Sequence, residues 1–357
     1  MKRYYTLTTC FFSLAFMVTL ASAQEDTKVH DGHVESEIKV EVLLGGLDNP
    51  CGVAIEPGTG DLFVSDSAAG KIIRIHKGQA SEVITDFPID VYGTGPKYNI
   101  GPLGLAFLEK GRLVVGGGGF IDGKDLLRLY DVPAVGEKAI TADKMAVNLG
   151  NLGPDDKILG EGNFYGVTIN RHGIFTTCNG DDTKGWVAKT EQNGTKFTPL
   201  KRFIASKEAT QVDAPVAITT CPKGFLAVGQ MGEILVPGDS LLTYYHPRTG
   251  EKLANFKTGL SDITGLAYSP QENLLYALDF SWHDTSAGGL YRLDAKLDEK
   301  NQQEVVATKL LALDKATSLV FGDDGSLYVT VFGSPQESET EKGGQLLKIT
   351  LPSPPAK

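Results

Sequence analysis

The chain has 357 residues, of which 44 are Asp or Glu and 34 are Lys or Arg, so its formal net charge at pH 7 is −10. An acidic surface argues against nucleic acid and anionic membranes as partners, because both would repel it. A chain of this length can bury about three quarters of its unfolded surface, so it needs no disulfide framework to be stable.

Residues 1–23 have the layout of a cleaved export signal. Lys2 and Arg3 precede an apolar run from Cys10 to Ala21, and small residues lead up to Gln24. The run is too short to span a bilayer, and no later apolar run approaches that length. We therefore expect an exported protein, secreted or periplasmic, whose mature chain starts with an acidic linker over residues 24–37.

One pattern then recurs along the chain: an apolar run, a turn and a second apolar run. The first copy is NPCGVAIEPGTGDLFVSDS, from Asn49 to Ser67. A small residue recurs in the first run of each copy, at Gly52, Gly104, Gly166, Ala217, Gly265 and Ser318. The intervals of 52, 62, 51, 48 and 53 residues indicate a repeat fold.

Each copy continues into further apolar strands. The third strands are expected at KIIRI, LLRLY, WVAKT, LLTYY, LYRLD and LLKIT. Four antiparallel strands make one propeller blade, and the first two runs alternate little, as expected for strands with a neighbouring blade on both faces. The pattern predicts an all-β protein, a six-bladed β-propeller over residues 38–351, followed by a tail over 352–357.

The last copy lacks a fourth strand, since the chain runs out in PSPPAK after its third. The segment from Ile38 to Leu44, IKVEVLL, precedes the first copy and has no other partner. We expect this N-terminal strand to complete the sixth blade and close the ring, because closure removes the exposed edges of an open sheet.

The segment from Leu47 to Ile75 resembles an NHL repeat, and the layout of copies is similar to six-bladed propellers of the NHL and SMP-30/gluconolactonase-like (TolB-like) group. Members of this group include binding modules, lactonases, lyases and dehydrogenases. The resemblance implies that metal ligands would lie directly before the inner-strand small residues, with an early Glu. Those positions hold Cys51, Leu103, Tyr165, Val216, Thr264 and Thr317, and Asn49 stands near the place of the Glu.

Loops that enter a first strand and loops that join a second to a third strand emerge on the same face of a propeller. These loops carry several oxygen-bearing side chains, of which Asn49, Asn163, Asp213 and Asp262 are candidate metal ligands. Carboxylate and amide oxygens suit a hard cation such as calcium. The alternative is that these residues only form turns, since Asn and Asp side chains bond nearby backbone N–H groups.

Two long connections, Phe87 to Pro102 and Gly150 to Gly166, overhang the same face. They carry an aromatic and cationic set that could stack on a sugar or a flat ligand: Tyr92, Lys97, Tyr98, Phe164 and Tyr165. The alternative is a plug that fills the channel. Shorter loops add the candidate ligand-binding residues Asn179, Asp181, Trp186 and Trp282.

His283 is the best candidate for acid–base catalysis, because the adjacent Asp284 could orient it. The alternative is a solvated loop histidine. Cys51, Cys178 and Cys221 are an odd set without CxxC spacing, so at most one disulfide can form and burial as small apolar residues is expected.

These patterns favour a monomer that binds a small molecule or saccharide at the funnel mouth. One alternative is a calcium-dependent lactonase, hydrolase or lyase of the SMP-30 type, with His283 as base. Another is a scaffold that captures a protein partner through its rim.

Overall fold

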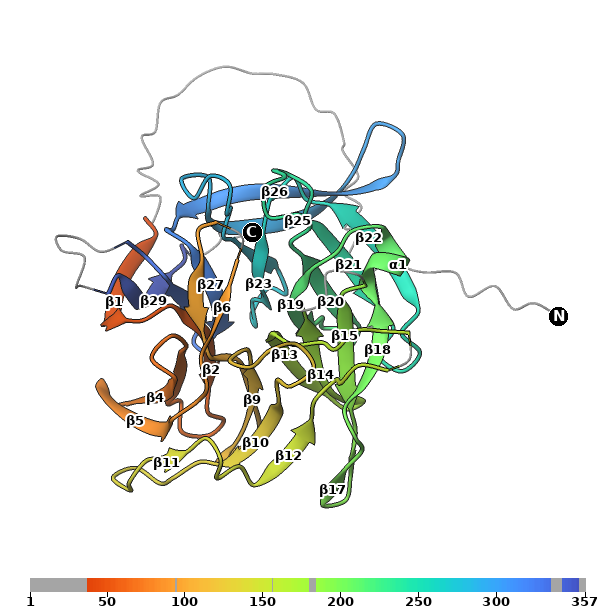
Figure 1. Cartoon of the computed structure of the whole chain (residues 1–357). Helices are drawn as coiled ribbons and strands as arrows, with labels where there is room; N and C mark the ends of the chain where they lie inside the picture. The colour runs from red at the N-terminus through yellow and green to blue at the C-terminus, as the bar shows by residue number, and fades with distance from the viewer. Residues whose placement is uncertain (1–36, 94, 156, 180–183, 335–341, 353–357) are drawn as a thin grey trace, which may run out of the picture. The chain divides into compact units, whose positions relative to one another are not determined.

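The computed structural model describes residues 37–93, 95–155, 157–179, 184–334 and 342–352. Within this part, Ile38–Leu351 forms one compact unit of six main sheets arranged as blades around a central axis (Figure 1). The prediction of an all-β, six-bladed propeller is confirmed.

From the axis outward, each blade holds four antiparallel strands. Blade 1 holds β2 (Pro50–Ile55), β3 (Leu62–Asp66), β4 (Lys71–His76) and β5 (Gln79–Thr85). Blade 2 holds β8 (Pro102–Glu109), β9 (Arg112–Gly117), β10 (Leu127–Asp131) and β12 (Val147–Gly150), and blade 3 holds β13 (Phe164–Asn170), β14 (Gly173–Cys178), β15 (Trp186–Thr190) and β18 (Lys201–Ala205). Blade 4 holds β19 (Pro215–Thr220), β20 (Leu226–Gln230), β21 (Leu241–Tyr245) and β22 (Lys252–Lys257). Blade 5 holds β23 (Ile263–Tyr268), β24 (Leu275–Asp279), β25 (Gly289–Leu297) and β26 (Gln303–Ala312).

Blade 6 joins the two ends of the described chain. Its sequence supplies β27 (Ala316–Phe321), β28 (Leu327–Val331) and β29 (Gly344–Thr350), and β1 (Lys39–Leu47) adds the outer strand. β1 runs antiparallel to β29, with Lys39 opposite Thr350 and Val42 opposite Leu347. The predicted closure of the ring by the N-terminal strand is therefore confirmed.

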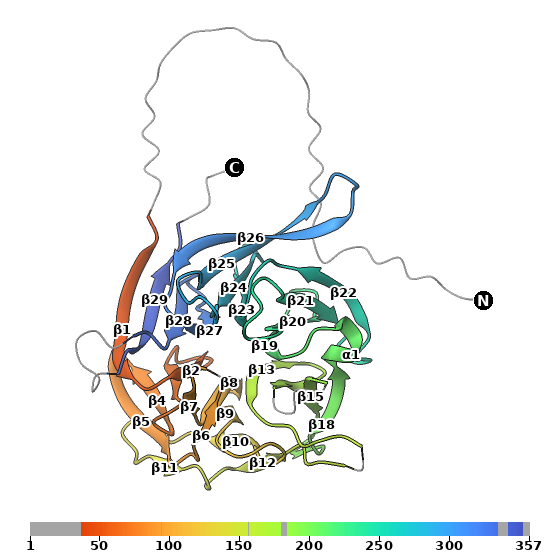
Figure 2. The same cartoon turned by 45° about the horizontal axis from the view of Figure 1, so that its top comes forward.

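The inner strands β2, β8, β13, β19, β23 and β27 surround the centre of the ring (Figure 2). The recurring small residues let these strands approach one another. A Cβ atom on Gly52 would lie 2.2 Å from the carbonyl oxygen of Leu103, and one on Gly104 would lie 2.1 Å from that of Tyr165. The repeat read from the sequence is thus the point where each inner strand touches the backbone of the next blade.

Blades pack through apolar side chains and a few buried hydroxyl groups. Phe63 of blade 1 and Tyr130 of blade 2, for example, are fully buried in one shared cluster. Ser65 Oγ donates a 2.7 Å hydrogen bond to the Leu103 carbonyl, and Thr317 Oγ1 donates one of 2.6 Å to the Pro50 carbonyl. These bonds satisfy backbone carbonyls where one blade meets the next.

Six small elements lie outside the regular blades. β11 (Ile140–Thr141) pairs in parallel with β5, which the repeat pattern did not predict. β6 (Asp90–Tyr92) and β7 (Tyr98–Ile100) form one hairpin, and β16 (Gln192–Asn193) and β17 (Lys196–Phe197) form another. The one helix in the described ranges, α1 (Ser206–Thr210), is five residues long, and none there has the length and apolarity to cross a membrane.

Candidate functional site

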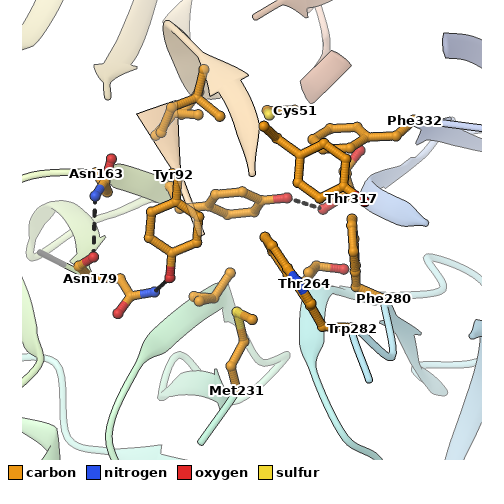
Figure 3. Close-up of a pocket in the computed structure, with 15 residues that line it drawn as sticks. Cys51, Tyr92, Asn163, Asn179, Met231, Thr264, Phe280, Trp282, Thr317 and Phe332 are labelled. Carbon is orange, nitrogen blue, oxygen red and sulfur yellow. Dashed lines mark hydrogen bonds between the residues drawn. The ribbon is translucent and has the colours of Figure 1, made fainter. Parts of the chain in front are cut away.

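Six equivalent residues line a cavity on the propeller axis, one from each inner strand. They are the residues directly before the recurring small positions: Cys51, Leu103, Tyr165, Val216, Thr264 and Thr317. The cavity has a volume of about 50 Å³ and lies among the side chains shown in Figure 3. None of its lining residues carries a carboxylate.

A second set of lining residues comes from the positions that follow the second strands. Asn179, Met231, Phe280 and Phe332 occupy this position in blades 3 to 6. The cavity, which we call the upper cavity, is thus built where first strands begin and second strands end. Sequence reasoning missed Met231, Phe280 and Phe332, although their constant offset from the repeat was a usable signal.

Five aromatic side chains, Tyr92, Tyr98, Phe280, Trp282 and Phe332, pack together over the upper cavity, and we call them the aromatic plug. The rings of Phe280 and Trp282 stack with centroids 4.9 Å apart. Tyr98 meets Trp282 and Phe332 edge to face, each at 5.2 Å. The rings pack against one another, and the remaining volume of about 50 Å³ is too small for a sugar. Of the two interpretations of the first long connection, the structure favours the plug.

The plug depends on a close approach of the hairpin β6–β7 to Trp282. Gly93 has a φ of +106°, and a Cβ atom on it would lie 2.7 Å from the Trp282 ring. A larger residue would therefore be strained and would push the two apart. Trp282 itself is 8% exposed.

Tyr165 separates the upper cavity from a second space further down the axis. Its hydroxyl donates a 2.9 Å hydrogen bond to the carbonyl of Thr317, which lies on the inner strand of blade 6. Tyr165 lines both the upper cavity and a lower cavity of about 380 Å³ formed by the inner strands. Burial raises the pKa of this phenol well above its usual value, so it stays a neutral donor.

Polar groups line one wall of the upper cavity. The Asn163 side-chain amide donates to the Asn179 carbonyl at 3.2 Å, and the Asn179 amide donates to the Tyr92 hydroxyl at 2.6 Å (Figure 3). Burial raises the pKa of the nearby Cys51 thiol to about 12, so Cys51 is not a thiolate nucleophile at neutral pH.

A larger hollow adjoins this polar wall, and we call it the outer hollow. Its volume is about 350 Å³, and it shares Tyr92, Ile100 and Asn163 with the upper cavity. Asp90, Asp122, Phe120 and backbone of Gly93 and Gly118 complete much of its lining. The buried Asp125 carboxylate links the Phe120 side of the hollow to the Asn163 side. It accepts hydrogen bonds from the backbone N–H groups of Phe120 at 3.0 Å and of Asn163 at 2.9 Å. Burial raises the Asp125 pKa to about 6.

Of the four predicted metal ligands, Asn163 is the one that lines the upper cavity or the outer hollow. Asn163 lines the upper cavity and the outer hollow, whereas the Asp213 carboxylate bonds Lys207 at 2.9 Å and the Asn49 amide donates to the Asn99 carbonyl at 3.1 Å. Asp262 accepts a hydrogen bond from the backbone N–H of Trp282, and burial raises its pKa to about 7.

The donor set of the upper cavity does not fit calcium, because that ion prefers several carboxylate or carbonyl oxygens. Among the described residues, no three His, Cys, Asp or Glu side chains are placed to share a metal ion. We therefore derive no chemical step through a metal.

The backbone explains why Asn stands at two of these positions. The residue three places before the small position is left-handed in four blades, with φ of 48° at Asn49, 50° at Asn163, 53° at Ala214 and 57° at Lys315. Asn adopts this conformation more readily than most residues.

The other predicted site residues lie away from the upper cavity. His283 and Asp284 are exposed, and Asp284 accepts hydrogen bonds from the N–H and hydroxyl of Ser286, which lower its pKa. Lys97 is exposed on the turn of the β6–β7 hairpin. Phe164 is fully buried between blades 2 and 3, and Trp186 packs against the same cluster. Asp181 lies outside the described residues.

Cys51, Cys178 and Cys221 are all buried, which agrees with the expectation that they serve as small apolar residues. This arrangement leaves no disulfide among the cysteines that the structure describes.

No family model matches the chain, and no curated protein matches it. Among solved structures, it is similar to an oxidoreductase from Thermus thermophilus described as a glucose dehydrogenase, with a TM-score of 0.58 and 17% identity, over 88% of this chain and 100% of that one. It is also similar to a gluconolactonase from Xanthomonas campestris, with a TM-score of 0.57 and 15% identity, over 89% of this chain and 90% of that one.

The soluble aldose sugar dehydrogenase from Escherichia coli gives a TM-score of 0.58 at 13% identity, over 88% of this chain and 99% of that one. At such identities the likeness concerns the fold. The protein is a six-bladed β-propeller with gluconolactonase and sugar dehydrogenase propellers among its structural neighbours.

Proposed function

We propose that this propeller binds a small saccharide or sugar lactone in the outer hollow. The observation that carries the proposal is the hollow itself, whose volume of about 350 Å³ lies in the usual range for small-molecule sites. The upper cavity, at about 50 Å³, is too small for this ligand.

The lining of the outer hollow has the chemistry that a sugar needs. Asp90 and Asp122 supply carboxylate oxygens that accept from sugar hydroxyls, and Asn163 supplies an amide. Tyr92 and Phe120 supply rings against which the C–H face of a sugar can pack.

Sugar lactones are a natural first choice of ligand, because one structural neighbour is described as a gluconolactonase and others as sugar dehydrogenases. Catalysis is a separate question, since neither exposed His283 nor Asp284 lines the hollow. Lactone hydrolysis should be followed by pH-stat on the same samples, with and without EDTA. Hydrolysis that EDTA abolishes would favour the calcium-dependent alternative over simple binding.

The test is isothermal titration with a panel of monosaccharides and their lactones. Asn163→Gly removes the amide but suits the left-handed backbone, so the fold should be kept while affinity falls about tenfold. Asn49→Gly is the matched control, because Asn49 has the same backbone conformation in blade 1 and does not line the hollow.

Asp122→Asn should also weaken binding, since it removes the charge of one acceptor. Equal affinities for wild type, Asn163→Gly and Asp122→Asn would refute the proposed site. The absence of saturable heat from every sugar and lactone would refute the ligand class.

A further inference from the structure

A cavity of about 470 Å³ lies at the turn between β13 and β14 and shares no lining residue with the outer hollow. The strand β15, the β16–β17 hairpin and the β21–β22 turn of blade 4 complete it. Turns between first and second strands emerge on the face opposite to the one that carries the upper cavity. The cavity is therefore independent of the proposed sugar site.

Cationic side chains dominate the lining of this cavity, although the whole protein is acidic. Arg171, Lys189 and Arg248 line it together with His172, and Glu191 is the one carboxylate among the lining residues. Three blades contribute, because Leu108 comes from blade 2 and Arg248 from blade 4. In a chain with a net charge of −10, such a gathering of positive charge is a local exception.

Lys189 anchors the set inside the protein. Its side chain is 3% exposed, and its ammonium lies 5.3 Å from the centre of the Phe175 ring and 5.0 Å from that of Phe203. The Lys189 ammonium forms a salt bridge with the Glu191 carboxylate, with 2.7 Å between Nζ and Oε1. The one acidic residue of the lining is thus already used to balance the buried lysine.

The guanidinium groups of the two lining arginines are not neutralised by a carboxylate of the described residues. Arg171 and Arg248 are both exposed, and neither forms an ion pair with any residue that the structure describes. Arg171 Nε donates to His172 Nε2 at 3.1 Å, so that ring nitrogen carries no proton. Burial lowers the pKa of His172 first, and the charges of Arg171, Lys189, His246 and Arg248 lower it further.

We propose that this cationic cavity binds an oxyanion, a phosphate or sulfate group held by Arg171 and Arg248. Guanidinium groups suit such ligands because their N–H donors match two oxygens at once. The ligand is either the free ion or an ester of it on a small molecule, and both present the same group. The net charge of −10 on the whole chain would discourage a polyanion such as nucleic acid.

The experiment is isothermal titration of the full chain with inorganic phosphate, inorganic sulfate, glucose 6-phosphate and glucose. The first three should bind saturably, with dissociation constants of about 1 mM or tighter, and Arg171→Ala should weaken them while leaving unchanged any binding of glucose, which the proposed function assigns to the outer hollow. Tighter binding of glucose 6-phosphate than of phosphate would identify an ester as the source, and equal binding would identify the free ion.

Arg171→Ala and Arg248→Ala should each weaken binding about tenfold, and both side chains are exposed, so the fold should be kept. Lys110→Ala is the matched control, because Lys110 is an exposed cation on the equivalent turn of blade 2 and does not line the cavity. NMR of the His172 ring gives a second readout, since a bound anion should raise its pKa.

Anion binding that Lys110→Ala weakens as much as the arginine changes would overturn the proposal in favour of general charge attraction. The absence of saturable heat from all three anions would also overturn it. Arg171→Ala should not change glucose binding in the outer hollow. Loss of anion binding and loss of glucose binding are therefore separate results, and each one tests a different site.

Discussion

The two ends of the central channel are lined by the same six inner strands, yet they differ greatly in how full they are. The upper cavity keeps about 50 Å³ beneath the aromatic plug, whereas the lower cavity keeps about 380 Å³. The lower cavity is lined by inner-strand residues such as Val53, Leu105 and Ile218. Tyr165 lines both and stands between them.

The difference shows that the repeat sets the width of the ring, and an insertion sets what fills it. The small residues at Gly52 and Gly104 fix how closely inner strands approach. The hairpin β6–β7 belongs to no repeat, and it brings Tyr92 and Tyr98 to one end only. The end without such an insertion keeps its space.

The largest expected effect comes from opening the ring, because both cavities depend on closure. Deleting residues 1–44 removes most of β1 and leaves β29 with a free edge. We expect a loss on the order of 5 kcal/mol in the free energy of unfolding, measured by denaturant titration. A chain that begins at Glu37 keeps β1 and is the control. Equal stability of the two chains would contradict the role of β1.

Next in size is the removal of the centre of the plug. Trp282→Ala should lower the free energy of unfolding by about 3–5 kcal/mol, since a large buried ring leaves a cavity. The cavity should be apolar enough to bind indole, which would raise the melting temperature of the variant and not that of the wild type. If indole stabilises neither protein, the removal of Trp282 does not leave a cavity at the upper end. Trp282 would then not be the side chain that makes the upper end fuller than the lower end.

A pH effect should accompany the plug, because the Asp262 carboxylate accepts a hydrogen bond from the backbone N–H of Trp282. Burial raises the Asp262 pKa to about 7, against about 3.9 in an unfolded chain. Between these values the unfolded chain releases the proton and the folded one keeps it, so stability falls as pH rises, by about 1.4 kcal/mol per pH unit at most.

Asp262→Asn keeps an oxygen that can accept from the backbone N–H of Trp282 but cannot titrate. Unfolding free energies of wild type and variant, compared at pH 5 and at pH 8, should differ in slope, with the variant less sensitive to pH. Glu304→Gln, an exposed change on β26, is the control. A variant as sensitive to pH as the wild type would mean that Asp262 ionises normally in the folded protein.

The blades could be predicted from the sequence because the small residue recurs wherever one inner strand meets the next blade. The closing strand was equally visible, since IKVEVLL had no other partner. β11 was not visible, because a two-residue parallel pair leaves no periodic pattern. The fold thus follows from contacts that repeat, and its exceptions from contacts that occur once.

The site was harder to predict because it depends on where side chains point in space. Phe164 and Tyr165 were both expected to face the ligand, but neighbours on a strand point to opposite sides. Tyr165 therefore reaches the axis, and Phe164 enters the core between blades. Asn49 and Asn163 were predicted as metal ligands, but Asn is also favoured wherever the backbone is left-handed, as it is at both positions. A single sequence does not distinguish these two reasons for an Asn.

The smallest expected effect concerns the wall between the two ends. Tyr165→Phe removes the hydroxyl that bonds the Thr317 carbonyl and keeps the ring, so about 1 kcal/mol of unfolding free energy should be lost. Tyr328→Phe, on β28 of blade 6 and outside both cavities, is the control and should change stability less. The ring of Tyr165 alone should then still divide the channel, because volume and not the hydrogen bond separates the two cavities. A loss as large as that of Trp282→Ala would show instead that the bond across the axis holds the plug in place.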